Sequence, residues 1–96
     1  MYVIAANLTA IPSQRDKLIQ IVSTLAQGSL TEEACKRFEV YQSVADVNEL
    51  IMYEEWLDLG DAVMLPHKAA EYYRQFDESR DFVVAKSSIN KYRVCE

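Results

Sequence analysis

Apolar and polar residues alternate along four segments of this chain, a pattern typical of half-buried β-strands. In the first segment, Ile4 and Leu8 fall on one face and Val3 and Asn7 on the other, because side chains two apart in a strand point the same way. The polar connection at residues 43–48 predicts a hairpin between the second and third segments. The predicted strands are residues 2–9, 36–43, 49–56 and 82–94.

Two other segments repeat apolar residues at the spacing of an amphipathic helix. The first helix is predicted to begin with a capping box at Ser13 and Asp16 and to end at Gly28, with one further helical turn through Ala34. The second is predicted to begin near Asp58 and to break or kink at Pro66, which cannot donate a backbone hydrogen bond. A further helical piece then covers about residues 68–76.

The predicted order is strand, helix, strand, strand, helix, strand. It indicates an α+β chain with the split βαβ, ferredoxin-like topology, an antiparallel sheet covered by both helices on one face. A length of 96 residues allows a single domain over 1–96. The strands nevertheless carry apolar residues on both faces, for example Met52 and Trp56 against Ile51 and Tyr53. We therefore expect a second copy of the sheet to cover the other face in a homodimer.

The composition argues against several classes of function. The formal net charge of -5 and the lack of Lys/Arg clusters argue against a nucleic-acid partner. No apolar run approaches the roughly 18 residues of a membrane span, and no signal peptide is visible, so a cytoplasmic protein without a membrane partner is expected. Cys35 and Cys95 with one histidine do not form a disulfide framework or a zinc site, and Cys35 is expected to be a buried thiol.

The residues with candidate chemistry follow the hairpin. Glu54 and Trp56 share a face of the predicted strand, so an ionisable group and a large ring enter one environment. His67 comes next, followed by Tyr72, Tyr73 and Phe76. Each also has a structural interpretation: Trp56 as a core anchor, Glu54 as the partner of a basic residue, and His67 at a solvated helix bend. Asn7 is unusual in a strand, which favours a place at a cavity or an interface.

In order and context, these motifs resemble the antibiotic biosynthesis monooxygenase (ABM) family of dimeric α+β barrels. The motifs that carry the resemblance are Glu33-Ala34-Cys35, Phe38-Glu39-Val40-Tyr41-Gln42, Glu54-Glu55-Trp56 and His67. Ala34 stands where the family usually has glycine, and no second tryptophan is present to match the haem-degrading branch, which disfavours that activity.

The resemblance implies an enzyme that oxidises a small aromatic, phenolic or quinol-type substrate with dioxygen and without a metal or other cofactor. In such an enzyme an apolar pocket stabilises a deprotonated substrate, which itself reduces oxygen. It implies Asn7 and His67 as catalytic residues in a pocket between sheet and helices. The implied walls of the pocket are Tyr53, Trp56, Tyr72 and Phe76.

Two alternatives stay open on the residues alone. One is an isomerase or lyase that moves a proton on a small carbonyl compound, with His67 and Glu54 as acid–base groups. The other is a non-catalytic dimer that binds a small apolar or aromatic ligand. Activity that does not depend on oxygen favours the isomerase or lyase over a monooxygenase. A ligand affinity that His67→Ala leaves nearly unchanged favours the non-catalytic dimer.

Overall fold

The structure, a computed structural model, describes residues 1–95 and confirms the predicted order of elements. A single 3-10 turn, η1 (Pro12–Gln14), precedes the first helix. The strands and helices are β1 (Tyr2–Ala10), α1 (Arg15–Ser29), β2 (Cys35–Gln42), β3 (Glu49–Trp56), α2 (Asp61–Ala69), α3 (Glu71–Val83) and β4 (Val84–Arg93).

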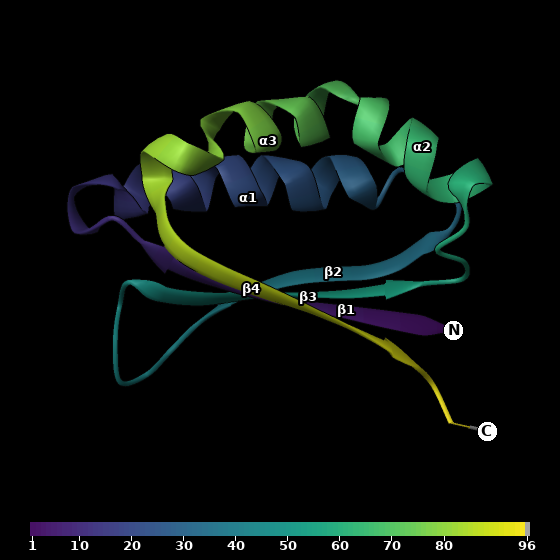
Figure 1. The fold of residues 1–96 in the computed structure, drawn as a ribbon, viewed down its shortest axis with the longest axis horizontal. Helices are drawn as coiled ribbons and strands as arrows, with labels where there is room; N and C mark the ends of the chain where they lie inside the picture. The colour runs from purple at the N-terminus through teal and green to yellow at the C-terminus, as the bar shows by residue number, and fades with distance from the viewer. Residues whose placement is uncertain (96) are drawn as a thin grey trace.

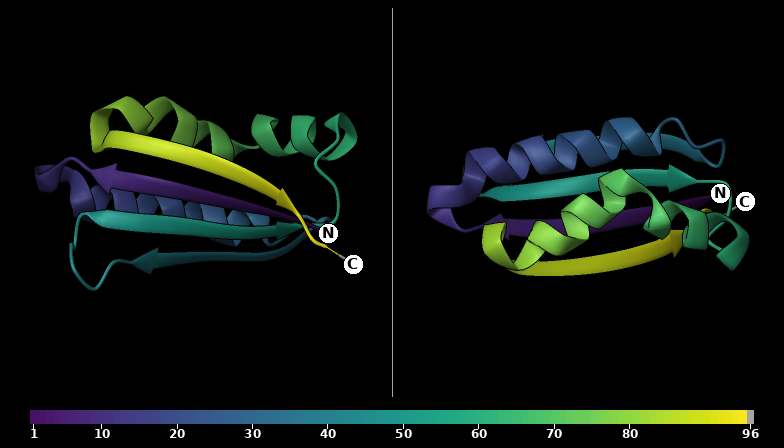
Figure 2. Two further views of the ribbon diagram at one scale, coloured as in Figure 1. Left: turned by 60° about the horizontal axis from the view of Figure 1, so that its bottom comes forward. Right: turned by 90° about the horizontal axis from the view of Figure 1, so that it is seen from above.

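The four strands form one antiparallel sheet in the order β2-β3-β1-β4. The three helices lie on one face of this sheet and leave the opposite face open (Figure 1). Seen from above, α1 runs beside the α2–α3 pair, and the start of β1 and the end of β4 lie at the same end of the molecule (Figure 2). This is the ferredoxin-like α+β fold that the sequence predicts.

The core lies between the sheet and the helices. Ile4, Ala6 and Leu8 of β1 and Leu50 and Met52 of β3 supply its sheet side, in the alternation read from the sequence. The helices supply the buried residues Leu18, Ile21, Val22, Leu25, Phe76 and Val83. Burying apolar side chains of this size stabilises the fold by roughly 1.5–3 kcal/mol each, which outweighs any single cap or surface ion pair.

Three predicted helix features differ from the structure. The capping box is wrong, because Pro12 begins a 3-10 turn and α1 starts at Arg15 without a side-chain cap. The further helical turn through Ala34 is also wrong, since residues 30–34 form turns. Asp58 does not cap α2; its carboxylate instead accepts the Gly60 N–H at 3.0 Å, and α2 begins at Asp61.

Pro66 does not break the helix as predicted. α2 continues through Pro66 to Ala69, and the break comes at Ala70, whose backbone is extended. Pro66 and Ala62 both border an open surface hollow, so water can bind the Ala62 carbonyl that the missing N–H leaves free. The last strand also begins later than predicted, because α3 extends to Val83.

The sheet face opposite the helices carries a mixed surface. Val3, Ala5, Ile51 and Tyr53 are only half-buried there, although no element of residues 1–95 covers them (Figure 1). The two-sided apolar pattern of β1 and β3 is therefore present in the structure. Among the helices of residues 1–95, none is long and apolar enough to cross a membrane.

Candidate functional site

A cavity of about 350 Å³ lies between the helix-facing side of the sheet and helices α2 and α3. Its wall is mostly apolar, and the side chains come from every strand and helix. A few ionisable groups interrupt this wall, the arrangement typical of small-molecule sites. The apolar lining residues are Ile4, Ala6, Leu8, Leu25, Phe38, Met52, Leu59, Met64, Phe76 and Ile89.

Glu54 lines this cavity from the centre of the sheet. It is only 7% exposed, and its carboxylate accepts the Trp56 indole N–H at 2.9 Å. Burial raises its pKa from 4.5 to about 7, while the Trp56 hydrogen bond and the charge of Lys91 act in the lowering direction. Desolvation disfavours the charged form, so this carboxyl group can take up or release a proton near neutral pH.

His67 enters the cavity from α2 and is 4% exposed, so the prediction that it could lie in solvent is wrong. Its Nδ1 lies 2.6 Å from a carboxylate oxygen of Glu32, in the turn between α1 and β2. Its ring packs edge-on against Trp56, with ring centres 4.7 Å apart, and against Tyr73 at 5.1 Å. These contacts fix the position of the imidazole.

Tyr72 adds a second hydrogen bond to the same oxygen of Glu32. Its hydroxyl donates at 2.6 Å, and burial followed by the Glu32 hydrogen bond raises the Tyr72 pKa to about 12. Gly28 makes room for this arrangement, because a Cβ at position 28 would overlap the Tyr72 ring. The absence of a side chain at Gly28 therefore matters for packing on Tyr72, rather than for ending the helix as predicted.

The Glu32 carboxylate determines which proton His67 carries. A carboxylate accepts hydrogen bonds, so neutral His67 holds its proton on Nδ1 and presents the lone pair of Nε2. Because the same carboxylate stabilises the imidazolium, Nε2 can accept a proton from a bound molecule. The arrangement is that of a general base oriented by a carboxylate.

The structure brings together some of the predicted site residues and separates others. His67 and Phe76 line the cavity as predicted. Trp56 and Tyr72 are not among its lining residues: Trp56 is fully buried behind His67, and the Tyr72 hydroxyl bonds to Glu32. The predicted places of Asn7 and Tyr53 in the cavity are wrong. Both alternate onto the opposite face of the sheet, where Tyr53 donates a hydrogen bond to Glu55 at 3.0 Å and Asn7 pairs with Ile51.

Several residues of the site were not predicted as such. Glu32 gave no local signal, because its partner His67 is 35 residues away. The sequence indicates Tyr73 only as part of an aromatic cluster, whereas in the structure it lines the cavity. Cys35 is buried as expected, and burial is the main cause that raises its pKa to about 12, so its thiol stays protonated.

The fold defines a ferredoxin-like α+β protein with a partly open cavity between the sheet and the helices. The family model for antibiotic biosynthesis monooxygenases matches residues 1–79, and the chain belongs to this family. YcnE of Bacillus subtilis, which carries a provisional monooxygenase name, is 26% identical over 76 residues, 79% of this chain and 78% of YcnE.

Solved structures agree with the fold. A protein from Nitrosomonas europaea, provisionally named an antibiotic biosynthesis monooxygenase, has a TM-score of 0.88 at 20% identity and full coverage of both chains. A protein from Pseudomonas aeruginosa has a TM-score of 0.86 at 24% identity, covering 98% of this chain and 94% of its own. At these identities the likeness establishes the fold and leaves the chemistry to the residues of the site.

Proposed function

We propose that this protein is a cofactor-independent monooxygenase that oxidises a small, electron-rich phenol or quinol in the cavity beneath α2 and α3. The observation that carries the proposal is the pairing of His67 with Glu32 at the wall of an apolar cavity. A base at the wall of a mostly apolar pocket favours the deprotonated phenol, the form that reacts with dioxygen.

The reaction would begin when Nε2 of His67 accepts the phenolic proton and Glu32 stabilises the imidazolium. A ring carbon of the phenolate then forms a bond to dioxygen, and the resulting peroxide anion takes the proton back from the His67 imidazolium to give a hydroperoxide. Cleavage of the O–O bond with loss of the carbon-bound hydrogen releases water and leaves the second oxygen atom on the ring as a carbonyl. The substrate supplies all the electrons, and the apolar wall shields the intermediates from solvent.

Oxygen consumption by metal-free protein with a panel of hydroquinones and phenols tests the proposal. We expect uptake above the uncatalysed rate, and a loss of roughly 10²- to 10⁴-fold in His67→Ala, the range for removing a general base. Ser88→Ala on β4 is the control, because Ser88 pairs with Asn7 on the opposite face of the sheet. Absence of uptake across the whole panel contradicts the proposal.

A second candidate is an isomerase or lyase acting on a small carbonyl compound. It is favoured by the presence of two ionisable groups, His67 and Glu54, in the wall of the same cavity. One could remove a proton from carbon while the other returns it elsewhere on the substrate. Turnover that proceeds equally well under nitrogen supports this candidate and excludes the oxygenase for that substrate.

We also propose that the working form is a homodimer in which two copies meet through the open sheet faces. The half-buried Val3, Ala5, Ile51 and Tyr53 support this arrangement, since no element of residues 1–95 covers them. Each subunit keeps its own cavity on the far side of its sheet.

A further inference from the structure

Three cationic side chains reach the cavity from three different elements. Lys68 comes from α2, Arg80 from α3 and Lys91 from β4, and all three are part of the cavity wall. The chain as a whole has only 10 lysine and arginine residues and a net charge of -5. Positive charge is therefore concentrated at the one place where a small molecule is proposed to bind.

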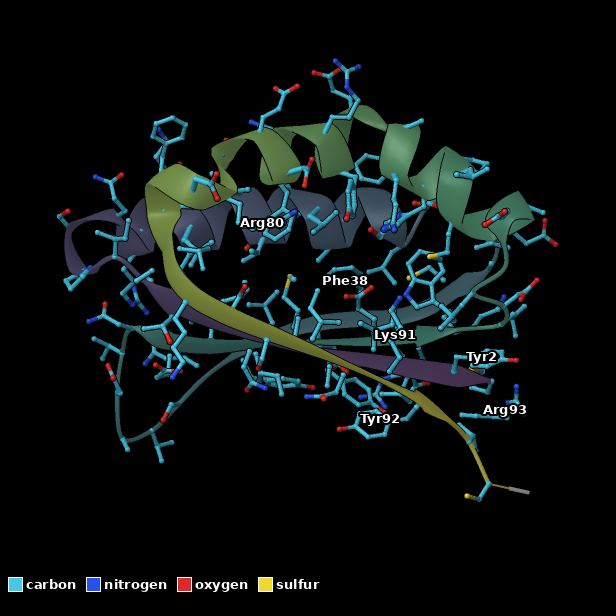
Figure 3. All side chains as sticks on the ribbon, in the orientation of Figure 1. Tyr2, Phe38, Arg80, Lys91, Tyr92 and Arg93 are labelled. Carbon is cyan, nitrogen blue, oxygen red and sulfur yellow. The ribbon has the colours of Figure 1, made fainter. Side chains whose placement is uncertain are left out.

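Lys91 is the cation that enters the cavity from the sheet side. It pairs with Ile4 across the sheet, so its side chain lies on the face that the helices cover. Figure 3 shows Lys91 with Phe38 between the sheet and the helices, whereas Tyr92, one residue on, points away from them. The charge of Lys91 acts on the pKa of Glu54, which places the ammonium group within electrostatic range of the cavity centre.

Among residues 1–95, two of these cations have no ion-pair partner. Arg80 bonds to Asp77 and stacks on Phe76 at 5.2 Å. Lys68 and Lys91 make no ion pair within residues 1–95. The acidic residues in the cavity wall are Asp61 and Glu54, and burial keeps Glu54 protonated over much of the range below pH 7.

We propose that the substrate is a phenol or quinol that carries a carboxylate group, and that Lys91 binds this carboxylate at the mouth of the cavity. The aromatic ring then occupies the apolar wall beside Phe38 and Phe76, with its hydroxyl toward His67. This inference rests on the proposed function for the identity of the ring, whereas recognition of the anion is independent of catalysis. A charge-assisted hydrogen bond to an ammonium is stronger than a neutral one, so it distinguishes an acid from its uncharged analogue.

Binding measured without oxygen tests the inference separately from turnover. We would titrate the protein anaerobically at low ionic strength with 2,5-dihydroxybenzoate and with 2,5-dihydroxybenzamide, using calorimetry. The two probes share the quinol ring and differ in the charge of one substituent. We expect the acid to bind at least about tenfold more tightly than the amide, and this preference to shrink as salt is added.

Two lysine variants of β4 test whether Lys91 causes the preference for the acid. Lys91→Met should reduce the preference for the acid to about twofold or less while the amide binds as before. Lys86→Met is the matched control, because Lys86 pairs with Thr9 and lies on the opposite sheet face. It should keep the preference. Circular dichroism checks that both variants are folded, which is expected because both lysines are exposed on an edge strand.

The possible results separate this inference from the proposed function. Equal affinity for acid and amide, no binding of either, or a preference that survives Lys91→Met overturns the inference, even if neutral quinols are oxidised. A Lys91-dependent preference for the acid supports it, even if no oxygen is consumed with any probe; in that case the oxygenase proposal fails and the anion site stands.

Discussion

At the scale of single residues, two carboxylates in one site have opposite properties because their surroundings differ. Glu32 accepts hydrogen bonds from Tyr72 and His67 and so holds the imidazole in place. Glu54 has a single donor, Trp56, and is surrounded by apolar residues, so burial raises its pKa to about 7. One carboxylate therefore orients the base, and the other can exchange a proton near neutral pH.

The Glu54 pKa makes a prediction about stability. The folded protein binds a proton that the unfolded chain releases between pH 4.5 and about 7, so the contribution of Glu54 to stability is greatest below pH 4.5 and is lost as the pH rises to about 7. The full loss in the free energy of unfolding from this one group is about 3 kcal/mol. Glu54→Gln stays neutral and keeps an oxygen for the Trp56 N–H, so chemical denaturation should show a free energy of unfolding that exceeds that of the native protein at pH 8 and approaches it at pH 4.5.

Glu55→Gln is the control for this experiment. Glu55 is the next residue of β3, lies on the opposite sheet face and is paired with Arg37 at 3.2 Å. Its variant should retain the decline of stability between pH 5 and pH 8 that the native protein shows. A native protein whose stability does not fall over this range contradicts the assignment of a raised pKa to Glu54.

Glu32 is predicted to act through His67 as a positioning residue. Glu32→Gln keeps an oxygen that can accept the Nδ1 proton, but it removes the charge that stabilises the imidazolium. We expect kcat to fall by roughly 10- to 100-fold with little change in KM, following the cost of removing the partner of an oriented base. Steady-state oxygen uptake as a function of pH measures this, and an equal fall in affinity with unchanged kcat contradicts the role.

The sequence carried information on some site residues and not on others. Alternation along β1 and β3 already separates Asn7 and Tyr53 from Ile4 and Trp56, so their exclusion from the cavity follows once it is clear which face the helices cover. The role of Glu32 could not be found in this way. It depends on a contact across 35 residues between a turn and a helix, and no local periodicity encodes such a contact.

At the scale of elements, the helix layer holds the site together through close packing of α1 against α3. Gly28 of α1 lies directly against the Tyr72 ring of α3, and the Tyr72 hydroxyl in turn bonds to Glu32.

The helix α2 also shows why a sequence pattern can predict the end of a helix wrongly. The sequence predicts a break or kink at Pro66, yet a carbonyl left free at a solvated surface costs little, and the helix continues to Ala69.

Gly28→Ala is predicted to disturb the site indirectly, by displacing Tyr72 from its hydrogen bond to Glu32. The new methyl group overlaps the Tyr72 ring, so the two helices must separate or Tyr72 must rotate away from Glu32. We expect a destabilisation of about 1–3 kcal/mol, the range for overpacking, together with reduced activity. Thermal denaturation measures the first effect. Gln27→Ala, at an exposed neighbouring position on α1, should change neither quantity. A Gly28→Ala protein as stable as the native one contradicts the contact.

At the scale of the whole molecule, the fold has two sheet faces with different surroundings. Helices bury one face completely at Ala6, Leu8 and Met52, while Ile51 and Tyr53 on the other remain partly exposed. A chain of 96 residues has a small core relative to its surface, so burying this second face against another copy, as proposed, would add to its stability. In the proposed dimer, each subunit would keep its own cavity on the helix side of its sheet.

Ile51→Arg tests the proposed dimer. Ile51 pairs with Asn7 on one side and Tyr41 on the other, near the middle of the open sheet face. An arginine there would bring an unpaired charge into the interface on each subunit, which should weaken association by at least about 2 kcal/mol. Sedimentation equilibrium at micromolar concentration should give a dimer for the native protein and a shift to monomer for Ile51→Arg. Gln75→Arg, on the exposed side of α3, should remain a dimer. If the native protein is a stably folded monomer under these conditions, the open face has another role and the proposed dimer is wrong.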